Sequence, residues 1–245
     1  MLTTILFDLD NTLLQNDMQD FVPRYFALIG SYADKYLPRN EFLQALMQAT
    51  DHMVQNVDPQ RTNREVFWQE FGRLSGLDTT VLEADFDRFY QHEFEALRDV
   101  TAPQPGAAPL VDWCRRQGLD IVVATNPMFP RRAIEARLSW AGLPASQQDF
   151  ALVTTMENMH ATKPNEVYYQ EILDRTGHAP AQALMVGDDW LRDIVPAANV
   201  GLHTYWVQPD EIEPSDNEVQ AGGQGTLEAL LARLQAGWLG AANAA

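Results

Sequence analysis

Short apolar runs, each ending in polar residues, recur along the chain. Five such runs, rich in Val, Ile and Leu, occupy residues 4–9, 121–124, 151–153, 184–186 and 203–207. Between the later runs, apolar residues recur three and four positions apart, which predicts helices at residues 131–140, 166–176 and 193–199. Strands that alternate with helices form right-handed βαβ units. The pattern therefore predicts an α/β fold built on a parallel sheet.

The segment of residues 13–100 has a different pattern and contains no convincing strand. Polar, proline and glycine breaks divide it into four amphipathic helices, predicted at residues 21–36, 39–56, 63–74 and 81–97. Residues 101–106, with two prolines and a glycine, are typical of a linker. We predict a core domain of residues 1–14 and 100–245, with an all-helical cap domain of residues 15–99 inserted after the first strand. We interpret the aromatic residues of the insertion as its hydrophobic core.

The C-terminal tail has a weaker pattern. Residues 214–217 and 222–225 are interpreted as loops, and residues 242–245 as a frayed end. Residues 226–234 fit a closing amphipathic helix with Thr226 as its N-cap.

The composition of the chain excludes several classes of function. The 245 residues are 46% hydrophobic, enough for a sizeable core, and the net charge of -17 would repel nucleic-acid backbones. The single cysteine permits no disulfide within the chain. With no signal-peptide pattern and no long apolar run, we expect a cytoplasmic protein with no membrane partner. Lys35 and Lys163 are the only lysines. A chain that avoids lysine so strongly has a chemical use for one it keeps, and we favour Lys163.

Acidic residues gather where two of the predicted strands end. Asp8 and Asp10 lie two positions apart, so in a regular strand they share a face, and a nearby cation would relieve their repulsion. Asp188, with Asp193 or Asp189, supplies further carboxylates at another strand end. Ligands of parallel sheets bind beyond the carboxyl ends of the strands, and Mg²⁺ prefers carboxylate and carbonyl oxygens. The pattern predicts a magnesium site at this edge.

The polar residues at the strand ends fit phosphoryl transfer. This reaction needs an in-line nucleophile, neutralisation of the phosphoryl oxygens and a proton for the leaving group. Asp8 can attack phosphorus, and Asp10 can protonate the departing alkoxide. Thr125 and Asn126 can hydrogen-bond the phosphoryl oxygens, and Lys163 can place a compact positive charge beside phosphate and nucleophile.

Taken together and in order, these motifs resemble the haloacid dehalogenase superfamily. The matching segments are DLDNT at 8–12, TN at 125–126, KP at 163–164 and GDD at 187–189, followed by Asp193. The resemblance implies a Rossmann-like core with strand order 5-4-1-2-3, a helical cap and a magnesium-dependent hydrolase. It also implies that Asp8 is the nucleophile and Asp10 the general acid/base. The implied metal ligands are Asp8, the Asp10 carbonyl and Asp188, and we favour Asp193 over Asp189 as the remaining partner.

Three other functions use some of the same residues or chemistry. A haloacid dehalogenase lacks an aspartate at the position of Asp10, because a halide leaving group needs no proton. A phosphomutase would share every residue named above. A phospho-aspartate switch is about half this length and has no inserted cap.

We therefore predict a phosphatase acting on a small phosphorylated metabolite, as a monomer or a homodimer. The arginines Arg24, Arg61 and Arg64 could meet a second anionic group of the substrate, but we favour solvated or paired side chains for them.

Overall fold

Strand β1 (Thr4–Phe7) is buried at every position and lies in the middle of a six-stranded parallel sheet. The computed structural model describes residues 1–208 and 219–240. On one side of β1 lie β4 (Asp120–Val123) and then β5 (Phe150–Val153). On the other side lie β6 (Ala183–Gly187), β7 (His203–Val207) and β8 (Gly223–Gly225). The predicted α/β class is confirmed.

The sheet differs from the predicted order by one added strand. The five predicted strands are neighbours in the order β7-β6-β1-β4-β5, which is 5-4-1-2-3 in chain order. Strand β8 extends the sheet beyond β7, pairing Tyr205 with Gly223 and Val207 with Gly225. The prediction of a loop at residues 222–225 was therefore wrong. Glycine-rich segments have low strand propensity, so this edge strand depends on tertiary contacts, above all its pairing with β7.

Helices cover both faces of the sheet, because successive strand residues point to opposite sides. Ile5 and Phe7 pack in one apolar cluster, which on this face of the sheet includes α5 (Ala107–Arg116), α6 (Arg131–Trp140) and α9 (Leu227–Gln235). Leu6 packs in a second cluster with α7 (Glu166–Thr176) and α8 (Val195–Val200). Short 3-10 turns occupy Ala145–Gln147, Pro180–Gln182 and Trp238–Gly240. The bounds predicted for α6 and α7 agree with the structure, and Thr226 caps α9 through Ala229 N–H.

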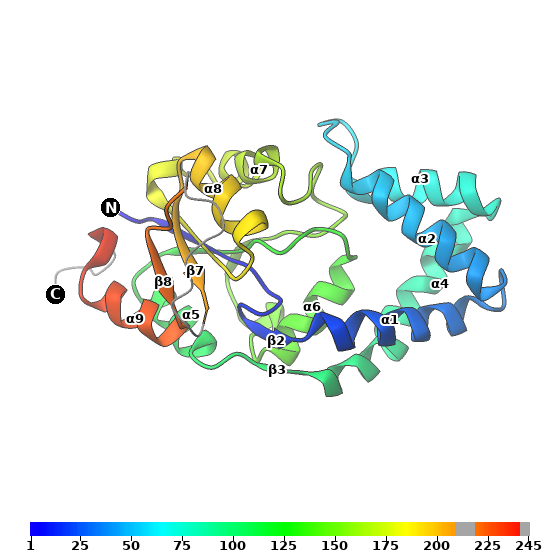
Figure 1. Cartoon of the computed structure of the whole chain (residues 1–245), viewed down its shortest axis with the longest axis horizontal. Coiled ribbons are helices and arrows are strands. Elements are labelled where there is room, and N and C mark those ends of the chain that lie inside the picture. The colour runs from blue at the N-terminus through cyan, green and yellow to red at the C-terminus, as the bar shows by residue number, and fades with distance from the viewer. Residues whose placement is uncertain (209–218, 241–245) are drawn as a thin grey trace.

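Four helices follow the first strand and lie to the right in Figure 1. They are α1 (Met18–Ala33), α2 (Arg39–Val54), α3 (Asn63–Ser75) and α4 (Thr79–His92). Side chains at the starts of three of them accept backbone N–H groups: Asp17, Asp78 and Thr62, which forms a capping box with Glu65. The fourth helix ends earlier than predicted, and a 3-10 helix over Glu93–Val100 follows it. Aromatic rings such as Phe42, Phe71 and Phe86 are buried, as expected of a core.

A short antiparallel ribbon joins the helical segment to the sheet domain. It pairs β2 (Leu14–Asn16) with β3 (Thr101–Pro103). This ribbon corrects two predictions, because residues 13–100 do contain a strand and the linker at residues 101–106 begins as one. Three-residue strands leave too little alternation to detect, and pairing across more than eighty residues is not a local signal.

A second contact ties the helical segment to the core. The backbone N–H groups of Asn63 and Arg64 donate to the carbonyls of Met159 and Met156, at 2.8 and 2.7 Å. The buried Asn63 side chain also donates to the Ala161 carbonyl, at 3.2 Å. The start of α3 is thereby fixed against the loop that follows β5.

None of the helices within residues 1–208 and 219–240 is long and apolar enough to cross a membrane. The predictions for residues 214–217 and 242–245 lie outside the described residues.

Candidate active site

The motifs of the sequence meet at the carboxyl edge of the sheet. Asp8 directly follows β1, Thr125 follows β4 by two positions, and Asp188 directly follows β6. Lys163 comes from the loop between β5 and α7, and Asp193 from a π-helical turn, Trp190–Ile194, after β6. Adjacent parallel strands end side by side, which places these distant residues together.

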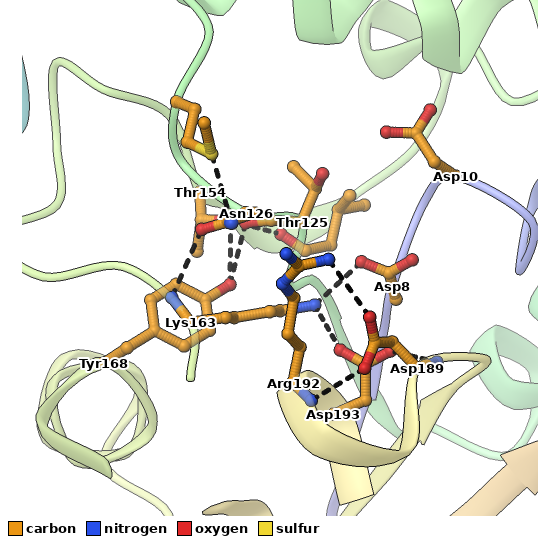
Figure 2. A network of polar contacts seen from close by, with 12 residues as sticks. Asp8, Asp10, Thr125, Asn126, Thr154, Lys163, Tyr168, Asp189, Arg192 and Asp193 are labelled. Atoms are coloured by element: carbon orange, nitrogen blue, oxygen red, sulfur yellow. Dashed lines mark hydrogen bonds and ion pairs between the residues drawn. The ribbon is translucent and has the colours of Figure 1, made fainter. Parts of the chain in front are cut away.

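A buried lysine bridges two of the aspartates. The Lys163 Nζ donates to Asp8 Oδ1 at 2.7 Å and to Asp193 Oδ1 at 2.6 Å (Figure 2). The Lys163 and Asp193 side chains are each only 2% exposed. An ammonium buried this deeply is stable only beside opposite charges, so the two carboxylates fix where Lys163 lies.

Carboxylate oxygens of Asp8, Asp188 and Asp193 all lie within 4.8 Å of one another. We call these three aspartates and Lys163 the strand-end cluster. Asp189 takes a different place, because its Oδ1 accepts the backbone N–H groups of Leu191 and Arg192. The geometry therefore puts Asp193, rather than Asp189, among the carboxylates that could hold a cation.

The electrostatics of the strand-end cluster favour a bound cation. Burial raises the pKa of Asp8 well above its ordinary value, and Asp193 and Asp188 add to this against the opposing charge of Lys163. Burial, and then Asp193, raises the pKa of Asp188 to about 7. Burial disfavours the Lys163 ammonium, but Asp193 and Asp8 outweigh it and raise its pKa. Three carboxylates share one ammonium, and a divalent cation would balance the remaining charge.

Gly187, which ends β6, makes room for the Asp193 carboxylate. A Cβ atom at this position would overlap Asp193 Oδ2, Cγ and Cβ. The Asp193 side chain also accepts the Asp189 backbone N–H, at 3.1 Å. The glycine of the GDD motif is thus required by packing, and the hard oxygen donors beside it fit Mg²⁺.

The two residues after β4 are held by the loops around them. The Thr125 carbonyl accepts the hydroxyls of Thr154 and Tyr168, at 2.6 and 2.9 Å. The Asn126 side chain accepts the Lys163 backbone N–H at 3.2 Å and donates to Met128 Sδ. The Asn126 amide therefore links the second and third motifs.

Asp10 lies apart from the strand-end cluster, with its carboxylate directed away from Asp8 (Figure 2). Its Oδ2 accepts Arg137 Nη1 at 2.5 Å, and its Oδ1 accepts Asn16 Nδ2 at 2.9 Å. The Arg137 side chain is 1% exposed and its guanidinium stacks on Phe129, at 4.7 Å from the ring centre. The Asp10 carboxylate is thus anchored between α6 and the ribbon strand β2.

Sequence reasoning missed Arg137 and Tyr168. A signal for Arg137 was present, because it stands on the apolar face of α6 with Ile134 and Leu138. An arginine on such a face needs a buried acidic partner. Tyr168 gave a weaker signal, since a tyrosine among core residues of α7 is ordinary.

An α/β sheet with a buried lysine and an acidic cluster at its strand ends, joined to a helical insertion, defines a class of hydrolases. This chain belongs to the haloacid dehalogenase-like hydrolase family, whose sequence pattern matches residues 2–201. The predicted membership and hydrolase class are confirmed.

The chain is similar to several known proteins. It is 33% identical over 146 residues to haloacid dehalogenase-like hydrolase domain-containing protein 3 of Xenopus laevis, covering 59% of this chain and 56% of that protein. It is 28% identical over 213 residues to ribulose-1,5-bisphosphate 5-phosphatase of Halopiger xanaduensis, covering 86% and 87%. The structure of 2-haloacid dehalogenase from Pseudomonas syringae superposes with a TM-score of 0.64 at 21% identity, covering 97% and 100%. At that identity the last comparison shows the fold alone.

Proposed function

We propose that this protein is a magnesium-dependent phosphatase that hydrolyses a small phosphorylated metabolite through an aspartyl-phosphate on Asp8. The observation that carries the proposal is the Lys163 ammonium, bonded to Asp8 and Asp193 beside Asp188 at the end of the central strand. The phosphatase named among the relatives supports a phosphate ester as the substrate. The domain boundaries at residues 14/15 and 99/100 also remain a proposal, supported by the β2–β3 ribbon at that junction.

In the first step an Asp8 oxygen attacks phosphorus, and the bond from phosphorus to the ester oxygen breaks. Asp10 gives a proton to the departing alkoxide from Oδ1, which exchanges its contact with Asn16 for the leaving oxygen while Arg137 holds Oδ2. Asp8, the Asp10 carbonyl, Asp188 and Asp193 would hold Mg²⁺, which supplies positive charge beside the nucleophile and the phosphoryl oxygens when bound.

In the second step Asp10 takes a proton from water, and the water oxygen attacks the phosphorus carried by Asp8. The products are inorganic phosphate and the free Asp8 carboxylate. Lys163 holds Asp8 in place and balances the phosphoryl charge, while the Thr125 hydroxyl and the Asn126 backbone N–H donate to the phosphoryl oxygens. The Asn126 side chain is committed to Lys163 and Met128, which leaves its backbone N–H for this task.

The presence of an aspartate at position 10 favours a phosphatase over a dehalogenase. A departing alkoxide needs a proton donor, whereas a halide leaves without one. A phosphomutase would return the phosphoryl group to a second hydroxyl, and a phospho-aspartate switch would keep it on Asp8.

One assay separates the phosphatase from the switch and from the dehalogenase. Purified protein is incubated with p-nitrophenyl phosphate, with Mg²⁺ or with a chelator, and phosphate release is followed over time. We expect steady turnover that needs Mg²⁺. A single stoichiometric release of nitrophenol would indicate the switch, and chloride release from a 2-haloacid without phosphatase activity would indicate the dehalogenase. The Asp8→Asn variant is the control for a contaminating phosphatase.

A further inference from the structure

A cavity of about 790 Å³ lies between the cap helices and the core. Its wall includes Tyr25 on α1, Trp68 on α3 and Tyr90 on α4, and on the core side Phe129, which follows the second motif. Folded proteins leave few voids larger than a water molecule, whereas ligand sites typically enclose 300–1,000 Å³. The size of this cap cavity is that of a ligand site.

Packed aromatic rings form the wall of the cap cavity. Phe42 stacks on Phe86, with ring centres 5.4 Å apart and planes 4° apart. Phe71 contacts Phe42 and Trp68, at 5.5 and 5.8 Å between ring centres. Rings that support one another in this way hold their positions without a ligand, so the apolar wall is preformed.

The cap cavity begins close to the phosphoryl-binding residues. Met128 lines it, and the Met128 sulfur accepts Asn126 Nδ2 at 3.2 Å. Phe129 also lines it and stacks on Arg137, which bonds Asp10. A phosphate ester bound at the strand ends therefore has a wall of the cap cavity next to its leaving group.

Charge at the cap cavity excludes a second anionic group. The described residues that line it include no lysine, arginine or histidine, but they include Glu83, Asp87 and Glu157. The arginines that contact lining residues already have acidic partners: Arg64 pairs with Glu83, Arg132 with Asp87, and Arg137, which stacks on Phe129, with Asp10. A second phosphate or a carboxylate would meet negative charge and find no free cation in this wall.

We propose that the cap cavity binds the uncharged, apolar part of the substrate, so that the enzyme acts on phosphate monoesters of alkyl or aryl alcohols. This inference rests on the proposed phosphatase function and names its substrate class. The apolar group supplies binding through burial, and the strand-end cluster supplies the chemistry.

A series of phosphate esters tests the proposal on the unmodified protein. Propyl phosphate, hexyl phosphate and the phosphate ester of 6-hydroxyhexanoate all release primary alkoxides, so the chemical step is matched and only the tail differs. Each buried methylene should raise kcat/KM about fourfold, or about sixtyfold from propyl to hexyl. The carboxylate-ended ester should lose most of this gain. Values of kcat/KM equal to within about twofold across the series would overturn the proposal.

A matched pair of variants locates the effect. Met47, on α2, lines the cap cavity with its side chain half exposed, so a lysine is tolerated there. Met47→Lys should lower kcat/KM for hexyl phosphate and raise it about fivefold for the carboxylate-ended ester. Val81→Lys is the control, because Val81 is also exposed on the cap but does not line the cavity. An equal response of the two variants would contradict the proposed location.

Failure of the substrate class and failure of the function give different results. If the phosphatase function is wrong, no ester in the series releases phosphate. If only the substrate class is wrong, every ester is hydrolysed and the tail has no effect.

Discussion

The strand-end cluster and the cap cavity lie at the same end of the sheet domain but are built from opposite kinds of residue. In the cluster, a lysine that is 2% exposed contacts two carboxylates, and its position depends on charge. The cap cavity is lined by rings such as Phe42 and Phe86, whose positions depend on packing. The comparison separates two tasks: charged groups at fixed distances perform the reaction, and apolar walls select what is brought to it.

This division has a consequence for mutation. Removing one charge from the strand-end cluster leaves its partners buried and unpaired, which costs more than removing an exposed ion pair. Variants of the cluster should therefore affect kcat and stability together, and variants of the cap cavity should affect mainly the choice of substrate.

The largest effect is expected from replacing Lys163, with the other lysine of the chain, Lys35, as the control. Lys163→Met should lower kcat about 300-fold, by loss of a preorganised charge, and should lower the free energy of unfolding by about 3 kcal/mol. Lys35→Met is the matched control, since Lys35 is 47% exposed and pairs with Asp85 on α4. It should change the free energy of unfolding by no more than about 1 kcal/mol. Steady-state kinetics and urea unfolding measure both. Equal losses in the two variants would remove the distinction between the buried cluster and an exposed ion pair.

A smaller and more selective effect is expected at Arg137, which anchors the Asp10 carboxylate. Arg137→Met should lower kcat/KM about 100-fold for hexyl phosphate, because its alkoxide needs the proton from Asp10. The loss of kcat/KM for p-nitrophenyl phosphate should be much smaller, because nitrophenolate leaves without a proton and the later hydrolysis of the aspartyl-phosphate does not enter kcat/KM. Adding Asp10→Asn should cause little further loss for hexyl phosphate.

Arg131→Met is the control for this prediction, since Arg131 is on the same helix and its side chain is 61% exposed. If Arg137→Met lowered kcat/KM equally for both esters, its role would be structural rather than one of positioning Asp10.

The smallest expected effect is a pH dependence of stability in the metal-free protein. Burial and Asp193 raise the pKa of Asp188 from 3.8 to about 7 in the folded state. A group with a raised folded pKa stabilises the protein fully below its unfolded pKa, and this contribution is lost as pH rises through about 7. In a chelator, Tm should therefore fall by a few degrees between pH 5 and pH 8.

Mg²⁺ should abolish this fall, because the cation replaces the protons among the carboxylates. Differential scanning calorimetry with and without Mg²⁺ measures the effect. A metal-free Tm that is constant or rises over this range would contradict the electrostatics described for the cluster.

The sequence predicted the parts of the fold that depend on local patterns. Five strands and the helices α6 and α7 follow from the pattern of apolar residues, and polar residues after each strand indicate the edge where the cluster lies. Strands β2 and β8 were not predicted, because each has only three residues and is stabilised by pairing with a strand that is distant in the sequence.

The candidate site shows the same limit. The contact between Lys163 and Asp8 was expected, because both residues belong to motifs that follow predicted strands. The hydrogen bond from Arg137 to Asp10 spans 127 positions, and Arg137 belongs to no motif. The sequence alone did not decide whether Asp189 or Asp193 is the remaining metal partner. The turn after β6 gives the two residues different roles. Asp189 caps that turn, whereas the Asp193 carboxylate packs against Gly187. The cap cavity depends on how four helices pack, which periodicity does not specify.

The central claim is that Asp8 is the residue that takes up phosphorus. The direct measurement is mass spectrometry of peptides from enzyme mixed with Mg²⁺ and a phosphate ester, then quenched in acid within one turnover. The account predicts a phosphoryl group on the peptide that contains Asp8, and its absence from Asp8→Asn. A phosphoryl group on another residue, or turnover by Asp8→Asn at the rate of the unmodified enzyme, would contradict it.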